Sequence, residues 1–110
     1  MREIAMRCLD YLQHEYDPKE YIGADYPDSI EELHRFVYDG GIWDGEFRRH
    51  YPVIKDKPIM ELTLQELFTV LTYIICTERC NEGFIEHNLR NGTMEALLMR
   101  YLELTKEDVK

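Results

Sequence analysis

Glu78 interrupts an otherwise apolar helical pattern, which makes it the most informative chemical group in this sequence. Each helical residue turns by about 100°, which places Glu78 between Leu71 and Ile74 on the apolar face. If the helix continues to this point, a carboxylate enters the core. A lone buried carboxylate is costly, so a partner is expected.

Several groups could serve as that partner. Arg79 follows directly but lies about 100° round the helix. Arg100, His87, a tyrosine hydroxyl and the N–H groups at the start of the next helix are better placed. We favour a structural role, in which Glu78 fixes the turn at Gly83 onto the last helix. The alternative is a functional site, because acids in unusual environments often mark such sites.

Cys76 and Cys80 are four residues apart, so on a helix their thiols share one face and could provide half of a metal site. His87 or Cys8 would have to complete it. Zinc sites usually combine a tight pair of ligands with a second pair elsewhere, a pattern that this sequence lacks. We therefore expect no metal ligands, and expect these cysteines to act as small core residues.

The four histidines do not form a recognised catalytic or metal-binding spacing with nearby acids; they are His14, His34, His50 and His87. The sequence also contains no phosphate-binding glycine loop, serine-centred elbow or dinucleotide fingerprint. We therefore predict no catalytic residues and no cofactor.

The elements that position these groups begin with a predicted central helix from about Leu64 to Cys80. Thr63 and Glu66 form a capping-box pattern at its start. No charged residue follows from Leu67 to Thr77, so the helix lacks a polar stripe. Such a helix is expected to be enclosed on nearly all sides.

The remaining helices are predicted from periodicity and caps. One runs from about Arg2 to Tyr16, and a second begins at a Ser29 and Glu32 capping box and ends at Gly40-Gly41. A short helix containing Phe84, Ile85 and Leu89 ends at Asn91-Gly92. Thr93 is expected to cap the last helix, whose inward face is Met94, Leu97, Leu98, Tyr101 and Leu102.

The segment from 42 to 61 is the least readable. Asp44 could cap a short helix that runs through His50 and is closed by Pro52, with Trp43 and Phe47 turned inward. An extended conformation from Tyr51 to Ile54 is equally consistent with the sequence.

Composition limits the class of protein. A chain of 110 residues has room for one domain, and its formal net charge of −9 would repel nucleic acid and anionic membranes. No apolar run is long enough to span a membrane. Three cysteines and the lack of a signal sequence favour a reducing, cytoplasmic location.

Four short patterns stand in the second half of the chain: Leu71-Thr72, the run from Thr77 to Gly83, Asn91-Gly92, and Leu97-Leu98 through Arg100 and Leu102. On these patterns, the end of the chain resembles a bacterial family of unknown function, DUF6508. The resemblance covers about the last 40 residues, with Cys80 standing where the family more often has phenylalanine. The resemblance implies an all-helical bacterial domain and assigns no activity.

Together these observations predict one all-α domain, residues 1–110, with about five helices around the central one. The expected function is a non-catalytic protein interaction or regulatory module, acting on an unknown protein partner or by self-association. The alternative is a small enzyme or ligand-binding domain with a pocket lined by Glu78, Arg79 and His87.

Overall fold

The computed structural model describes residues 2–17, 31, 32, 34, 35, 37, 43–81 and 83–106, with the backbone alone for Arg2 and Arg79. These residues contain five α-helices and one 3-10 helix: α1 (Arg2–His14), α3 (Phe47–Ile54), η1 (Ile59–Glu61), α4 (Leu64–Cys80), α5 (Phe84–Arg90) and α6 (Thr93–Leu104). None of the described residues forms a strand. The predicted all-α fold is confirmed.

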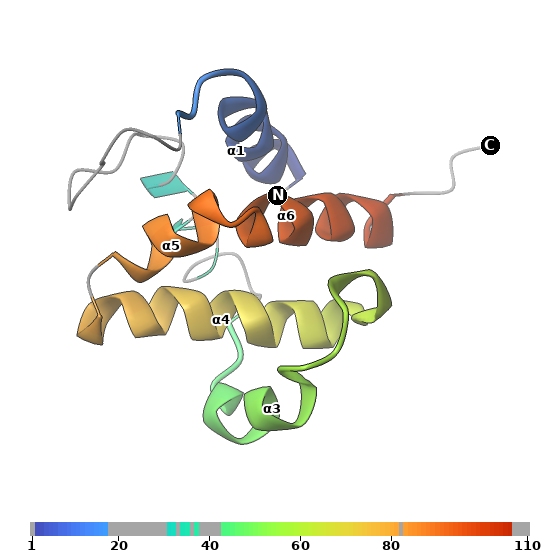
Figure 1. Ribbon diagram of the computed structural model, residues 1–110. Helices are drawn as coiled ribbons and strands as arrows, with labels where there is room; N and C mark the ends of the chain where they lie inside the picture. The colour runs from blue at the N-terminus through green and yellow to red at the C-terminus, as the bar shows by residue number, and fades with distance from the viewer. Residues whose placement is uncertain are drawn as a thin grey trace.

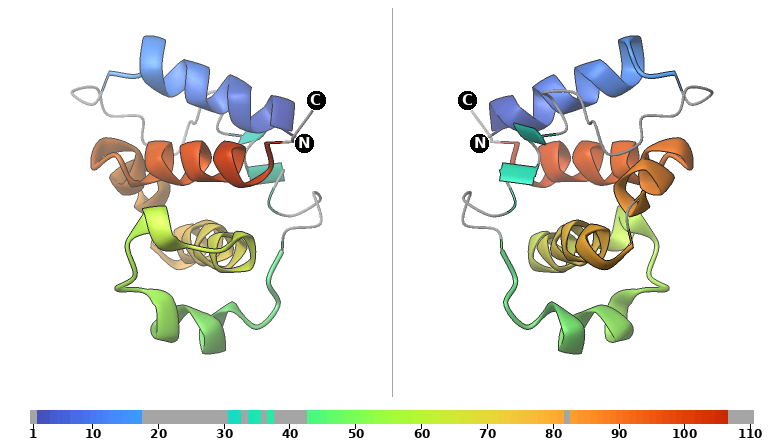
Figure 2. Two further views of the ribbon diagram at one scale, coloured as in Figure 1. Left: turned by 90° about the vertical axis from the view of Figure 1, so that its right-hand side faces the viewer. Right: turned by 90° about the vertical axis from the view of Figure 1, so that its left-hand side faces the viewer.

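The helices are stacked in the order α1, α6, α4 and α3, as both Figure 1 and Figure 2 show. The contacts agree with this order, because α1 packs on α6, α6 on α4, and α4 on α3. Helix α5 contacts both α4 and α6 and joins their ends. Helix α6 therefore runs back along α4 in the opposite direction (Figure 1).

Helix α4 occupies the centre, as predicted. Its start is a complete capping box: the Glu66 N–H donates to Thr63 Oγ1 at 3.2 Å, and the Thr63 N–H donates to Glu66 Oε1 at 2.9 Å. These bonds satisfy two N–H groups that the first turn would otherwise leave without partners. The sequence signal at Thr63 thus fixes the observed start at Leu64.

The core lies on both sides of α4. Leu67, Leu71, Ile74 and Ile75 are buried, and so are Thr69 and Thr72 on another face of the helix. The other elements contribute further buried side chains: Ala5, Cys8, Val37, Leu62, Ile85, Leu89, Met94, Leu97, Leu98 and Tyr101. Enclosure of α4 follows from its uncharged sequence, since no face of its middle section carries a charge for solvent.

The structure corrects two expectations for the segment before η1. Helix α3 continues through Pro52 to Ile54 and does not close at the proline, which also rules out an extended Tyr51–Ile54. Pro52 cannot donate to the carbonyl of Arg48, but both residues are exposed, so water can take the place of that bond. Phe47 is buried as expected.

Trp43 does not turn inward. It remains 38% exposed, with its ring edge against Phe47 at a centroid distance of 6.4 Å. Phe47 fills the inward position beside α4, where its ring meets Tyr73. Trp43 is therefore left at the surface, next to the start of α3.

The ends of two other helices also differ from prediction. Helix α1 stops at His14, where a turn replaces the last residues expected to be helical. Gly92, and not Thr93, occupies the N-cap of α6. Its φ of 83° is a left-handed conformation that favours glycine, and the Thr93 N–H donates instead to Asn91 Oδ1 at 2.9 Å.

Some expectations fall outside the described residues, including those for Ser29, Gly40 and Gly41 and for most of the charged tail. Residues 31, 32, 34, 35 and 37, within the expected second helix, are helical. No helix in the described part of the chain is both long and apolar enough to cross a membrane.

Arg100 connects α6 to the segment that precedes α4. Its hydrogen bonds described below go to Leu62 and Glu103 and not to Glu78. Its Nε and Nη2 donate to the Leu62 carbonyl at 3.1 and 3.0 Å, and its Nη1 pairs with Glu103. The side chain is 17% exposed. These two guanidinium N–H groups therefore provide hydrogen bonds to the Leu62 carbonyl, which lies outside any α-helix.

Replacing Arg100 by methionine should lower the free energy of unfolding by about 1–3 kcal/mol, because hydrogen bonds from a charged group are lost at a mostly buried site. Urea unfolding measures this change. Arg49→Met is the matched control: Arg49 forms an exposed pair with Glu46, so the change should stay within about 0.5 kcal/mol. Equal losses in the two variants would contradict the assignment.

Candidate functional site

Glu78 lies in the last turn of α4, where its side chain is partly buried and faces the start of α5. Its Oε1 accepts the Ile85 N–H at 2.8 Å and its Oε2 accepts the Gly83 N–H at 3.1 Å. Gly83 is the N-cap of α5, so both N–H groups belong to the first turn and lack partners within the helix. The sequence suggested several partners for Glu78, and the N–H groups at the start of the next helix do bind it.

This arrangement uses the electrostatics of a helix start. A carboxylate near a helix N-terminus is stabilised by the partial positive charge there. Gly83 suits this turn because its φ of 98° is a left-handed conformation that other residues rarely adopt. These two bonds join the last turn of α4 to the first turn of α5, whereas the sequence analysis expected Glu78 to fix the turn onto the last helix.

His87 lies on the other side of this turn. Its ring stacks on Phe84 at a centroid distance of 6.2 Å, and its Nε2 lies 3.4 Å from Asn91 Nδ2. With Asn81, Gly83 and Phe84 it lines a small cavity of about 350 Å³. The backbone of Arg79 is in α4, and its side chain is outside the described part. A joint pocket of Glu78, Arg79 and His87 remains a hypothesis.

The three cysteines occupy two different environments. Cys8 is fully buried, and this burial raises the pKa of its thiol to about 12. Cys76 is half-buried and Cys80 is exposed, so the expectation that both are core residues is wrong for Cys80. Both line one cavity between α3 and α4. Among the described residues, no three His, Cys, Asp or Glu side chains are placed to share a metal ion.

The largest cavity described here, of about 530 Å³, lies where α3 and the turn before it meet the first half of α4. We call it the α3–α4 cleft. It is lined by Trp43, Asp44, Gly45, Glu46, His50, Val53, Ile54, Gln65, Glu66, Phe68 and Thr69. The lining thus combines apolar side chains with three carboxylates and one imidazole.

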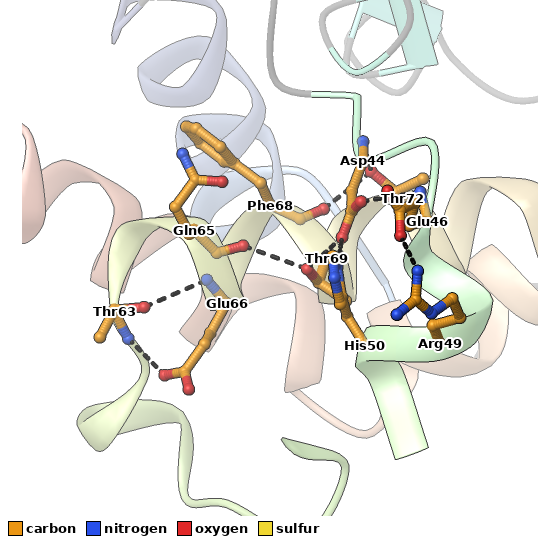
Figure 3. Close-up of polar contacts among 10 residues, drawn as sticks. All are labelled: Asp44, Glu46, Arg49, His50, Thr63, Gln65, Glu66, Phe68, Thr69 and Thr72. Carbon is orange, nitrogen blue, oxygen red and sulfur yellow. Dashed lines mark hydrogen bonds and ion pairs between the residues drawn. The ribbon is translucent and has the colours of Figure 1, made fainter. Parts of the chain in front are cut away.

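Asp44 organises the polar part of this cleft (Figure 3). Its Oδ2 accepts the Thr69 hydroxyl at 2.5 Å and lies 2.8 Å from His50 Nδ1. Its Oδ1 accepts the Glu46 N–H at 2.9 Å, which closes the turn into α3. Its own N–H donates to Thr72 Oγ1 at 3.1 Å. Two threonines of α4 therefore hold the turn that leads into α3.

These contacts determine the charge state of the acid. Desolvation raises the pKa of Asp44, but the hydrogen bonds from Thr69, His50 and the Glu46 N–H outweigh it, so the pKa lies below the usual 3.8. An ionised carboxylate can only accept hydrogen bonds, so His50 Nδ1 carries the hydrogen that points at it. When the ring is neutral, Nε2 is therefore the acceptor, and the His50 side chain is 53% exposed.

Two nearby cations pair with the remaining carboxylates. Arg49 Nη1 is 2.5 Å from Glu46 Oε1, and Lys57 Nζ is 2.7 Å from Glu66 Oε1. Neither Arg49 nor Lys57 lines the cleft. Hydrogen bonds from Lys57 and from the Thr63 N–H hold the pKa of Glu66 below its usual value. The lining itself therefore presents negative charge and hydrogen-bond acceptors.

The sequence does not reveal this cluster. Asp44 and His50 are six residues apart and meet through a turn, whereas the motifs considered above have fixed helical or knuckle spacings. One signal was available: Thr69 and Thr72 are polar residues in a helix with no exposed stripe, and such hydroxyls need partners. That signal indicates a bonded neighbour but not which one.

The fold and cleft define the class of protein as an all-α domain with an acidic, tryptophan-edged surface cleft. Within that class, the chain belongs to a family of unknown function, DUF6508, whose sequence profile matches residues 13–107. The match extends well beyond the last 40 or so residues to which the resemblance had been assigned. No curated protein and no solved structure matches the chain significantly.

Glu78→Gln should destabilise the protein, because an amide keeps one acceptor oxygen and turns an NH₂ donor toward the other backbone N–H. We expect a loss of about 1–3 kcal/mol, seen as a melting temperature several degrees lower. Glu61→Gln, the same change at an exposed position in η1, should leave the melting temperature unchanged. An unaltered melting temperature for Glu78→Gln would show that these bonds do not fix the turn.

The lowered pKa of Asp44 predicts a pH-dependent contribution to stability. Because the folded-state pKa lies below the unfolded value of about 3.9, the contribution is present above that value and is lost as pH falls through the folded pKa. The difference in unfolding free energy between the unaltered protein and Asp44→Asn should therefore shrink from about pH 5 downward. Urea unfolding at several pH values tests this; a difference that persists at pH 2 would be inconsistent with it.

Proposed function

We propose that this protein is a non-catalytic interaction module that docks a short, positively charged segment of a partner protein in the α3–α4 cleft. The observation that carries the proposal is that exposed apolar side chains and carboxylates line the same cleft. Trp43 is 38% and Val53 is 83% exposed, and both line the same cleft as Asp44, Glu46 and Glu66. This surface suits a ligand with apolar anchors and cationic groups.

The apolar part of the cleft supports binding. Large apolar side chains that gather beside a concave surface commonly mark interaction sites. Tryptophan is enriched among the residues that dominate binding energy, because it buries a large rigid surface. Phe68 of α4 also lines the cleft.

The charge of the cleft favours a cationic partner. Three carboxylates line it and no Lys or Arg does, in a chain with a formal net charge of −9. Arg49 and Lys57 pair with two of these carboxylates from outside the lining. The Arg49–Glu46 pair is exposed on both sides, and such pairs contribute little, so an incoming guanidinium or ammonium group can replace Arg49. His50 Nε2 adds an acceptor for a donor-rich ligand.

This interpretation leaves Glu78 with an architectural role. Its two oxygens accept backbone N–H groups of α5, so both already have donors. A functional pocket of Glu78, Arg79 and His87 would have to share a carboxylate whose two oxygens already hold the start of α5. The contacts therefore favour the interaction module over a ligand-binding site at that turn.

A second candidate is a small-molecule or catalytic site at Asp44 and His50. The 2.8 Å contact from His50 Nδ1 to Asp44 is the orientation that activates a general base at Nε2. The candidate is distinguished by ligand type: a thermal-shift screen would show a small uncharged compound with a hydrogen-bond donor whose stabilising effect disappears in His50→Gln. A cationic peptide should still bind that variant.

Binding is measured through Trp43, the single tryptophan of the chain. Titration with a short peptide that alternates arginine and leucine should change the emission of Trp43 in a saturable manner, because the ring becomes buried. A peptide that alternates glutamate and leucine should produce no saturable change. Equal responses to both peptides would contradict the proposed charge preference.

Charge reversal at the cleft supplies the matched test. Glu46→Lys should weaken binding of the arginine–leucine peptide about tenfold or more, because like charges now face each other. Glu61→Lys makes the same change outside the lining and should have a much smaller effect. Similar losses in both variants would indicate a general charge effect and would overturn the cleft as the docking site.

A further inference from the structure

A second cavity, of about 300 Å³, lies between α3 and the last two turns of α4. Tyr51 and Tyr73 form one wall, stacked at a centroid distance of 3.8 Å with an angle of 6° between their planes. Burial is the main cause of the raised pKa of Tyr51, so this side chain stays uncharged at neutral pH. Cys76 and Cys80 line the same cavity. We call it the thiol cavity.

Cys76 and Cys80 are positioned to bind one ligand together. Residues four apart on a helix lie on the same face, with about 5–6 Å between their Cβ atoms. A metal–thiolate bond is about 2.3 Å for zinc, so two sulfurs on opposite sides of one ion are roughly 4.6 Å apart. Rotation of the side chains can bridge that difference without moving the helix.

We propose that Cys76 and Cys80 bind a single copper(I) ion as a two-coordinate dithiolate in the thiol cavity. In this reaction two thiols and one Cu⁺ give an anionic bis-thiolate complex and release two protons. No electron is transferred. Soft thiolate ligands select soft ions such as copper(I).

The ligand count decides against zinc. Structural zinc sites are almost always four-coordinate, and catalytic ones use three protein ligands. Within the described residues, no three potential ligands among His, Cys, Asp and Glu come together. Two thiolates can complete the coordination of a monovalent soft ion, whereas they would leave a zinc ion half coordinated.

The surroundings suit an anionic complex. Arg48 also lines the cavity, where its guanidinium lies 4.9 Å from the centre of the Phe47 ring. Its positive charge can balance the single negative charge of the bis-thiolate. The stacked tyrosines form one wall of the same cavity. A cation, an aromatic wall and two thiols thus meet in one cavity.

Cys8 provides a control within the same chain. It is a reduced thiol in the core, and burial raises its pKa to about 12, so it does not form a thiolate near neutral pH. It should contribute nothing to copper binding. The three cysteines therefore give three distinguishable single variants.

The test is an anaerobic competition titration in which the protein takes copper(I) from the chromophoric chelator bicinchoninate. The unaltered protein and Cys8→Ala should each bind one copper(I). Cys76→Ser and Cys80→Ser should each lose about 100-fold or more in affinity, since even outer-shell partners are worth about 10–100-fold. Circular dichroism of each variant checks that the helices are intact.

Three results would overturn the proposal. The first is equal affinity of the unaltered protein and both serine variants. The second is loss of binding in folded Cys8→Ala. The third is a zinc(II) affinity that depends on Cys76 and Cys80 and exceeds the copper(I) affinity in the same buffer. The peptide titration that tests the α3–α4 cleft is independent of all three.

Discussion

Enclosure of helix α4 is the constraint on which the rest of the structure depends. The helix packs against α3, α5 and α6, so polar groups along it cannot rely on water and must find partners in the chain. Thr69 and Thr72 bond to Asp44, and Glu78 bonds to the first N–H groups of α5. Each of these side chains holds a neighbouring segment in place. The polar groups of the central helix therefore determine how its neighbours are attached.

This constraint also explains why the two proposed sites lie along α4. The turn before α3 is held by threonines in the first half of the helix, and the α3–α4 cleft is formed there. Further along, Tyr73 and Tyr51 stack, and the thiol cavity is formed beside them. Both cavities thus follow from the packing of the short helix α3, with its exposed Pro52, against one long rigid helix.

Much of the fold could be predicted from local signals. The capping box at Thr63 and the uncharged run after it establish α4, and Asn91-Gly92 establishes the break between α5 and α6. The end of α3 and the position of Trp43 could not be predicted, because Pro52 normally suggests a helix end and tryptophan is normally expected in the core. Their actual placement depends on tertiary contacts with α4, and local sequence patterns do not reveal such contacts.

The candidate site was predictable only in part. The carboxylate of Glu78 required a partner, and the sequence places the N–H groups of the next helix among the candidates. Asp44 and His50 come together through a turn whose geometry depends on Thr72, so no spacing rule identifies them. The cysteines illustrate the same limit: Cys80 is exposed although it ends a helix whose uncharged run predicts burial.

The most direct test of the account is an amide NMR titration with the arginine–leucine peptide. We expect shifts for residues of the α3–α4 cleft, such as Glu46, Gln65 and Thr69, and none for Gly83 and Ile85, because Glu78 holds these two residues in the fold. Shifts centred on Gly83, Ile85 and His87 with the cleft unchanged would contradict it and would place the functional site at Glu78.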